Sequence, residues 1–226
     1  MPRDTFEKHI NNLKNKLLEL GTMTSQTVTD SVEALKARDR VMAESLIARD
    51  QEINRLRYAI EEQAYELMAT QQPLASDLRE IIAVLLIAIE LERIADHAKN
   101  LGEIVIHMGN EPLLKPLIDI PRMAEICESM LAQSLDALVR RDAELARTVA
   151  ARDDEVDHLY QQIFRELLTF MLEDTRTVTR AMNLLFAAHN LERIGDRVTN
   201  IGERVYYAVT GRLEEWNTGK EIETLS

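Results

Sequence analysis

The chain has 226 residues and a formal net charge of −12, and it contains one cysteine, seven glycines and five prolines. The negative balance argues against nucleic acid or an anionic membrane surface as the main partner. The scarcity of glycine and proline, together with 29% charged residues, is typical of a protein built from long helices.

Three helices are predicted in the first half of the chain, over Thr5–Ala37, Arg40–Ala69 and Ser76–Met108, because apolar residues recur there with helical periodicity. Pro73 disfavours helix at the residue before it and so separates the second helix from the third. Serine commonly caps a helix N-terminus, so we expect Ser76 to cap the third helix.

The second half repeats this pattern after a proline-rich linker, Gly109–Pro121. Helices are predicted over Arg122–Arg140, Ala143–Leu172 and Thr177–Val209. The residues after Gly211 form a polar tail that we expect to fray. No segment alternates as a strand, so the predicted fold class is all-α.

None of these helices is suited to cross a membrane. The N-terminal residues MPRDTFEKHINNL contain no apolar signal region. The longest apolar run, residues 81–89, is far shorter than the roughly 20 residues that span a bilayer. Cys127 has no second cysteine to pair with, so we interpret it as a small core residue in a reducing compartment. We expect a soluble cytoplasmic protein without direct membrane insertion.

The two halves are copies of one sequence unit. DSVEALKARDRVMAESLIARDQEINRL, from Asp30, matches QSLDALVRRDAELARTVAARDDEVDHL, from Gln133, at an offset of 103 residues. LERIADHAKNLGE, from Leu91, matches LERIGDRVTNIGE, from Leu191, at an offset of 100 residues. A repeat of this length indicates a duplicated domain. Because short connections favour antiparallel packing, we expect two tandem three-helix bundles, residues 1–110 and 111–226.

The repeated motif places two carboxylates four residues apart in each copy, Glu92 with Asp96 and Glu192 with Asp196. Residues with this spacing are neighbours on a helix, so each like-charged pair destabilises its helix by about 0.2–0.5 kcal/mol unless a positive group lies nearby. Lys99 can reach Asp96 from one turn away, whereas its counterpart in the second copy is a threonine.

The hairpin of the first copy brings further oxygen atoms to the same level. Residues equidistant from the turn of an antiparallel hairpin lie side by side. With the turn centred on Pro73, Glu92 is level with Asn54, and Asp96 is level with Asp50. One cluster of carboxylate and amide side chains is therefore predicted between the second and third helices.

The second copy follows the same arithmetic. With its turn centred between residues 174 and 175, Glu192 is level with Asp157, and Asp196 is level with Asp153. Since Asn54 stands where this copy has Asp157, the first site should be the weaker one. The predicted metal ligands are Glu92, Asp96, Asn100, Asp50, Glu192, Asp196, Asn200, Asp153 and Asp157.

Oxygen ligands at this density suit hard or borderline divalent cations and ferric iron. We therefore expect iron, zinc, manganese or magnesium, in mononuclear or multinuclear sites. The plainer interpretation is an acidic, solvated helix surface, and spacing alone leaves it open. The duplication favours metal, because both copies keep the acids while the basic neighbours change.

Catalysis has little support in the sequence. A carboxylate-bridged di-iron enzyme uses Glu-x-x-His pairs on facing helices. His97 follows Glu92 by five residues and His189 precedes Glu192 by three, so neither forms such a pair. No glycine-rich phosphate loop or nucleophile elbow is present. We expect a protein that is not an enzyme. The alternatives are a carboxylate-rich metalloprotein with storage or enzymatic activity and a purely structural helical spacer.

The tandem LERIADHAKN and LERIGDRVTN resemble the duplicated Glu/Asp-x-x-x-Asp signature of the PhoU family. QQPLASDLR, residues 71–79, resembles the segment that opens the family's third helix, and MLEDTRTVTRAMNLLFAAHNLERIGDR, residues 171–197, resembles its counterpart in the second repeat. The similarity extends over the chain up to about Gly211.

This resemblance implies a cytoplasmic, all-helical negative regulator of the phosphate-starvation response that modulates high-affinity phosphate ABC transport. The implied partners are the ATPase subunit of the transporter and a phosphate-sensing histidine kinase, in complexes at the inner membrane. A homodimer is also expected, because two motif faces permit dimerisation. Metal clusters on the motif face are also implied. The motif positions here are Glu92, Asp96, Asn100, Glu192, Asp196 and Asn200, and Asp50, Asp153 and Asp157 match acidic positions of the preceding helices.

Overall fold

The computed structural model describes residues 2–216, which form six long α-helices and one short 3₁₀ helix. The predicted all-α fold class is confirmed, and each predicted helix boundary lies within three residues of the observed one. The elements are α1 (Pro2–Ala37), α2 (Arg40–Thr70), α3 (Ala75–Met108), α4 (Asp119–Arg140), α5 (Ala143–Glu173), η1 (Thr175–Thr177) and α6 (Val178–Thr210).

The first turn of each repeat is built in the same way. Arg38 and Arg141 end α1 and α4 in the left-handed conformation, with φ of 54° and 55°. The next residue then caps the following helix, because the carboxylate of Asp39 accepts from the Met42 amide at 3.0 Å. Asp142 does the same for α5. The equivalence predicted from the aligned sequences therefore extends to backbone geometry and capping.

Four predicted helix starts differ from the observed ones by one to three residues, and the differences at α3 and α4 concern the helix caps. α3 begins at Ala75, with Leu74 rather than Ser76 in the capping position and without a side-chain cap. The first turn of this helix is largely exposed, so water can satisfy its free amides. α4 begins at Asp119, and it includes Pro121, which was assigned to the linker. Proline is tolerated in the first turn of a helix, because its missing amide has no intrahelical acceptor there.

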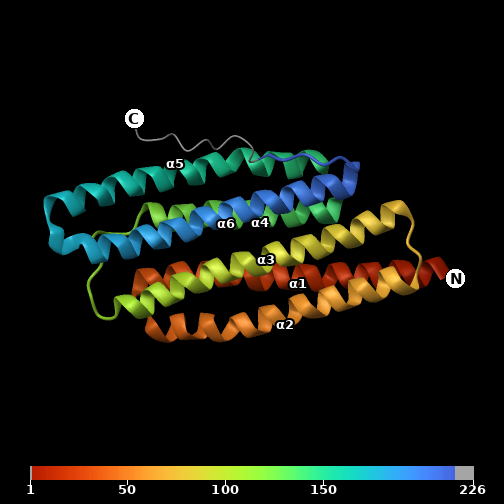
Figure 1. The fold of residues 1–226 in the computed structure, drawn as a ribbon, viewed down its shortest axis with the longest axis horizontal. Helices are drawn as coiled ribbons and strands as arrows, with labels where there is room; N and C mark the ends of the chain where they lie inside the picture. Colours follow the sequence, from red (N-terminus) through yellow and green to blue (C-terminus); the bar gives the residue numbers. More distant parts are fainter. Residues whose placement is uncertain (1, 217–226) are drawn as a thin grey trace.

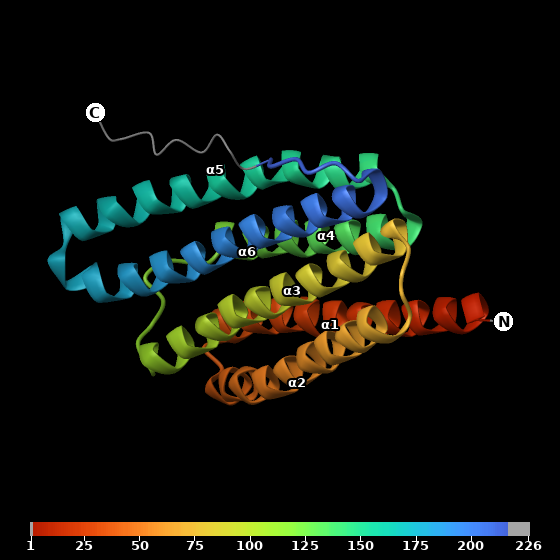
Figure 2. The same ribbon diagram turned by 45° about the vertical axis from the view of Figure 1, so that its right-hand side comes forward.

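The two bundles pack into one block. Figures 1 and 2 show α3 and α6 side by side through the middle of the molecule, with α2 and α5 at opposite outer edges. α1 also contacts α4, so the repeats meet along two helix pairs. The buried apolar residues of both repeats belong to one continuous cluster. The largest fully buried side chains include Leu13, Leu17, Leu20, Leu35, Leu46, Ile53, Ile60, Ile81, Ile87, Leu91, Ile94 and Leu101.

Cys127 lies in this core, as predicted, and it is fully buried. Its Sγ donates to the carbonyl of Leu191 at 3.4 Å. In the first repeat, the hydroxyl of Thr24 donates to the carbonyl of Leu91 at 3.3 Å. Cys127 therefore occupies the structural position of Thr24, and burial raises the pKa of its thiol well above the usual value.

The beginning of the C-terminal tail does not fray. Residues 211–216 run back along the second repeat, and the ring of Trp216 packs edge-on against Tyr206, with centroids 5.6 Å apart. An ideal Cβ at Gly202 would lie only 3.0 Å from this ring, so the glycine provides the space that the indole fills. The rest of the predicted tail, residues 217–226, lies outside the described residues.

Among the described helices, none combines the length and the apolar character that crossing a bilayer requires.

Candidate functional site

A close helix crossing next to the motif sets the geometry of each hairpin. An ideal Cβ at Gly102 would lie 3.2 Å from the carbonyl oxygen of Ala43, and one at Gly202 would lie 3.1 Å from that of Ala146. The two pairs are equivalent in the repeat and are nearly equidistant from their turns. They confirm the antiparallel register from which the acidic clusters were predicted.

In the first repeat, Asp50 of α2 and Asp96 of α3 lie at the same level, as predicted. The ammonium of Lys99 joins them, with Nζ 2.7 Å from Asp96 Oδ1 and 3.5 Å from Asp50 Oδ1. The amide of Asn54 donates to the other oxygen of Asp50 at 3.2 Å. The hairpin therefore brings together acids that are 46 residues apart in sequence.

Glu92 belongs to the same cluster. Burial raises the pKa of its carboxyl, and the negative charges of Asp96 and Asp50 raise it further, against the opposing effect of Arg57. Burial is also the main cause of the raised pKa of Asp50, which Lys99 partly offsets. A structure that disfavours two ionised carboxylates in this way favours an added positive charge.

The acidic cluster of the second repeat is more enclosed. Asp153 is only 1% exposed, and an ideal Cβ at Gly195 would lie 2.6 Å from its Oδ1. The glycine thus leaves room for the carboxylate against the backbone of α6. The first repeat has Ala95 at this position, and the Asp50 side chain there is 17% exposed. The interior glycine, costly in a helix by roughly 0.5–1 kcal/mol, was the sequence signal for this difference.

The motif carboxylates of the second repeat have basic neighbours at the rim. Asp196 accepts from Arg193 at 2.9 Å. Glu192 Oε2 lies 3.4 Å from Nδ1 of His189, whose ring approaches that of Tyr160. Burial and Arg193 lower the pKa of His189, which favours the uncharged imidazole beside Glu192. Among the predicted ligands, the partly exposed carboxylate of Asp157 lies one turn from that of Asp153 on α5.

The two motif asparagines face the other repeat. The amide of Asn100 donates to Asn190 Oδ1 at 3.2 Å, and that of Asn200 approaches Glu90 Oε2 at 3.4 Å. The two contacts are reciprocal, because residues 90 and 190 are equivalent in the repeat. The structure therefore places these amides at the α3–α6 contact, and their membership of a metal site stays a prediction.

A second reciprocal pair reinforces this contact. His97 Nδ1 lies 3.0 Å from Asn190 Oδ1, and Arg197 Nη1 lies 3.5 Å from Glu90 Oε2. Glu90 is only 8% exposed. Neither residue 90 nor residue 190 was predicted to have this role, although each directly precedes a matched motif block. Their role depends on which surface of α3 meets α6, and periodicity does not specify that.

The oxygen ligands of both acidic clusters suit a hard cation, but the two clusters differ in burial and in their basic neighbours. Across residues 2–216, no group of three or more histidine, cysteine or acidic side chains is placed to hold one metal ion. The second repeat offers a buried carboxylate, Asp153, which lies against Gly195, the residue before Asp196. In the first repeat, Lys99 already lies between the two aspartates.

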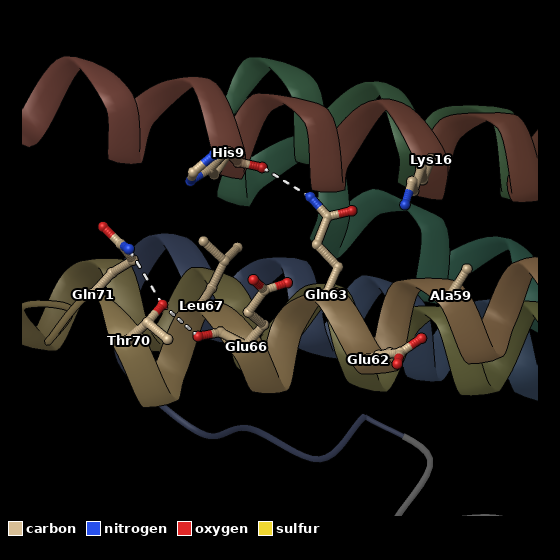
Figure 3. Close-up of a pocket in the computed structure, with 9 residues that line it drawn as sticks. All are labelled: His9, Lys16, Ala59, Glu62, Gln63, Glu66, Leu67, Thr70 and Gln71. Carbon is tan, nitrogen blue, oxygen red and sulfur yellow. Dashed lines mark hydrogen bonds between the residues drawn. The ribbon is translucent and has the colours of Figure 1, made fainter.

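A separate cavity of about 340 Å³ lies between α1 and α2. Figure 3 shows His9 and Lys16 of α1 facing the α2 side chains, with Gln63 donating to the carbonyl of His9 at 3.4 Å. Its lining is polar and includes Glu62 and Glu66. The cavity shares no residue with the acidic clusters, so it is no extension of them.

Both repeats match the family model described as the PhoU domain, over residues 17–105 and residues 120–205. A relative from Zymomonas mobilis, named phosphate-specific transport system accessory protein PhoU homolog, is 38% identical over 218 residues, which cover 96% of this chain and 92% of the relative. A relative of the same name from Rhizobium meliloti is 39% identical, with the same coverage of 96% and 92%.

Solved structures show the same full-length similarity. PhoU from Pseudomonas aeruginosa has a TM-score of 0.87 and 36% identity, and the match covers 92% of this chain and 100% of that one. The phosphate transport system regulatory protein PhoU from Streptococcus pneumoniae has a TM-score of 0.86 and 30% identity, with coverage of 93% and 99%.

Proposed function

The chain belongs to the PhoU family, and from this premise we propose that it is an accessory protein of phosphate transport that represses the phosphate-starvation response. It is a regulatory protein and not an enzyme. The observation that supports the proposal is the match of both repeats, over nearly the whole chain, to proteins named as accessory or regulatory proteins of phosphate transport. The alternative of a metalloenzyme was therefore wrong. No observation favours a metal store or a structural spacer.

The proposed mechanism is that of an adaptor. The chain would act in the cytoplasm, on complexes at the inner membrane, as a homodimer that joins the ATPase subunit of the phosphate ABC transporter to a phosphate-sensing histidine kinase. Two repeats, for which we propose the limits 1–110 and 111–226, offer two outer edges for such contacts. These edges are α2 and α5 (Figure 2), which expose apolar side chains such as Val41 and Leu172.

Deletion of the gene tests the regulatory role. We expect alkaline phosphatase to become constitutive in phosphate-rich medium, because the repressing adaptor is missing, and we expect the intact gene on a plasmid to restore repression. Any paralogous genes must first be deleted from the strain. Phosphatase that stays repressed in such a strain would contradict the proposal.

We also propose that the acidic clusters bind metal. The ligands would be Asp50, Glu92 and Asp96 in the first repeat and Asp153, Asp157, Glu192 and Asp196 in the second, with Asn100 and Asn200 as neighbouring amides. A bound cation would neutralise the repelling carboxylates and hold the two helices of each hairpin together. The raised pKa values of Asp50 and Glu92 support the proposal, because burial, with a smaller contribution from neighbouring carboxylates, disfavours these acids in their ionised form.

Paired substitutions test these ligands. Glu192→Ala with Asp196→Ala should remove most of the bound metal, because two of the converging carboxylates are lost, and the Glu92→Ala, Asp96→Ala pair should remove a smaller part. Elemental analysis measures the metal, and circular dichroism should show unchanged helix content. Unchanged metal in both variants would rule out these ligands.

A further inference from the structure

We propose that Lys99 is a built-in counter-ion of the first repeat, which occupies the cation position between Asp50 and Asp96 and makes this repeat the weaker metal site. The inference rests on the proposed metal binding, and it assigns the difference between the two repeats to one side chain. It replaces the expectation that Asn54 alone weakens the first site.

The position of the ammonium is the first step. Lys99 Nζ lies within 3.5 Å of carboxylate oxygens from two helices, α2 and α3. Its side chain is only 21% exposed, and that of Asp50 is 17% exposed. The charge therefore lies inside the hairpin, where solvent screens it less than at an open surface. A lysine ammonium is a compact point charge, so it can take the position of a small cation between two carboxylates.

A divalent cation would have to compete with this ammonium. It would need oxygens of Asp50 and Asp96, and binding them would break both ion pairs or bring two positive charges close together. The carboxylates of the first repeat are thus partly neutralised before any metal arrives. The affinity of this repeat for a divalent cation must fall accordingly.

The second repeat differs at the equivalent position. Thr199, which corresponds to Lys99, is fully buried and uncharged. Asp196 forms an ion pair with Arg193, whose side chain is 39% exposed and can turn toward solvent. The same duplication therefore places an ammonium between two aspartates in the first repeat and an uncharged threonine at the equivalent position of the second. We infer that metal enters the second repeat first.

Titration of the metal-free full chain with Mn²⁺, followed by the paramagnetic resonance signal of free Mn²⁺, tests the inference. Lys99→Met keeps the aliphatic stem and removes the charge, so it should tighten the weaker class of Mn²⁺ sites at least tenfold or create a class that the unmodified chain lacks. Adding Asp50→Asn should abolish this gain. Lys99→Arg retains the charge and should bind as the unmodified chain does.

Lys36→Met is the matched control, because it also removes one lysine from an ion pair with an acid three residues away, but at an exposed site on α1. It should leave the isotherm unchanged. Thermal unfolding gives a second readout, since Mn²⁺ should raise the midpoint of Lys99→Met more than that of the unmodified chain.

The outcomes separate this inference from the proposed metal function. Identical isotherms for Lys99→Met and the unmodified chain overturn the inference. If that shared binding is lost in Glu192→Gln, the metal function itself stands. No Mn²⁺ uptake by any of these proteins, including Lys99→Met, overturns both.

Discussion

At the residue scale, the two acidic clusters differ not only by Lys99 but also by one methyl group on the motif helix. Gly195 lets the carboxylate of Asp153 pack against the α6 backbone, where a Cβ would lie 2.6 Å away. Ala95 carries that methyl group in the first repeat, and Asp50 stays more exposed there. The duplicated unit has thus been adapted twice, with a buried carboxylate in one copy and a paired lysine in the other.

The carboxylate of Glu92 is held at a cost to stability, since burial and its acidic neighbours raise its pKa above the usual 4.5. A raised pKa means that the folded state retains the proton to a higher pH than the unfolded state does. The associated stability is fully present below the unfolded pKa and is lost as the pH rises through the folded pKa. This loss is the stability cost of keeping the Glu92 carboxylate half-buried among other acids.

Glu92→Gln should therefore stabilise the metal-free protein at pH 7 but not at pH 4, because glutamine resembles the protonated acid. The expected rise in unfolding midpoint at pH 7 is on the order of 2 °C. Thermal melts of both proteins at the two pH values measure it. Glu33→Gln, at an exposed position of α1, is the control and should show no such pH-dependent gain. An equal shift at both pH values would contradict the assignment.

At the element scale, the tail after α6 is the clearest departure from its sequence pattern. Residues 211–216 look polar, yet they are fixed by a network across α5 and α6. Arg147 donates to the Tyr206 hydroxyl at 3.0 Å and to Glu214 at 2.7 Å, and the Trp216 amide donates to Glu203 at 2.7 Å. The polar residues of the tail serve as partners for groups on the helices.

Arg147→Ala should loosen this tail, because it removes contacts to both Tyr206 and Glu214. Trp216 is the single tryptophan of the chain, so its fluorescence reports the docking directly. We expect emission to shift to longer wavelength and acrylamide quenching to increase, without loss of helix content. Arg140→Ala, which removes an exposed ion pair with Asp136, should leave both unchanged. Unaltered quenching in Arg147→Ala would show that this network does not hold the tail.

At the scale of the whole molecule, the two repeats share one hydrophobic core. α3 and α6 pack along each other, and the buried residues of both repeats form one cluster. Reciprocal polar contacts of Glu90 and Asn190 cross this interface. Since neither bundle can expose that face without losing its core contacts, the repeats should unfold together.

Leu91→Ala and Leu191→Ala test this cooperativity at equivalent, fully buried positions. Each should lower the free energy of unfolding by about 2–5 kcal/mol, through the lost burial and the cavity that remains. Urea titrations should show one transition for each protein, with helix content and Trp216 fluorescence changing together. Val41→Ala, at a side chain that is 77% exposed, should have little effect. If the urea midpoint of the Trp216 fluorescence transition in Leu91→Ala equalled that of the unmodified chain, the repeats would unfold independently.

The sequence by itself determined the helices, the duplication and the register of each hairpin. Helical periodicity depends on nearby residues, and short turns leave little freedom in the level at which two helices meet, so Asp50 could be placed beside Asp96 from counting alone. The contacts around that pair could be predicted only in part. The reach of Lys99 to Asp96 followed from spacing, but its second contact to Asp50 required the packed hairpin.

Only the tertiary structure decided which surfaces of α3 and α6 face each other, and hence why Asn100 and Asn200 point into the other repeat. It also decided the docking of Trp216, which depends on the space left by Gly202. The physical reason is the same in both cases. Periodicity assigns a residue to a side of its own helix, whereas the occupant of that side is set by close packing between segments far apart in the chain.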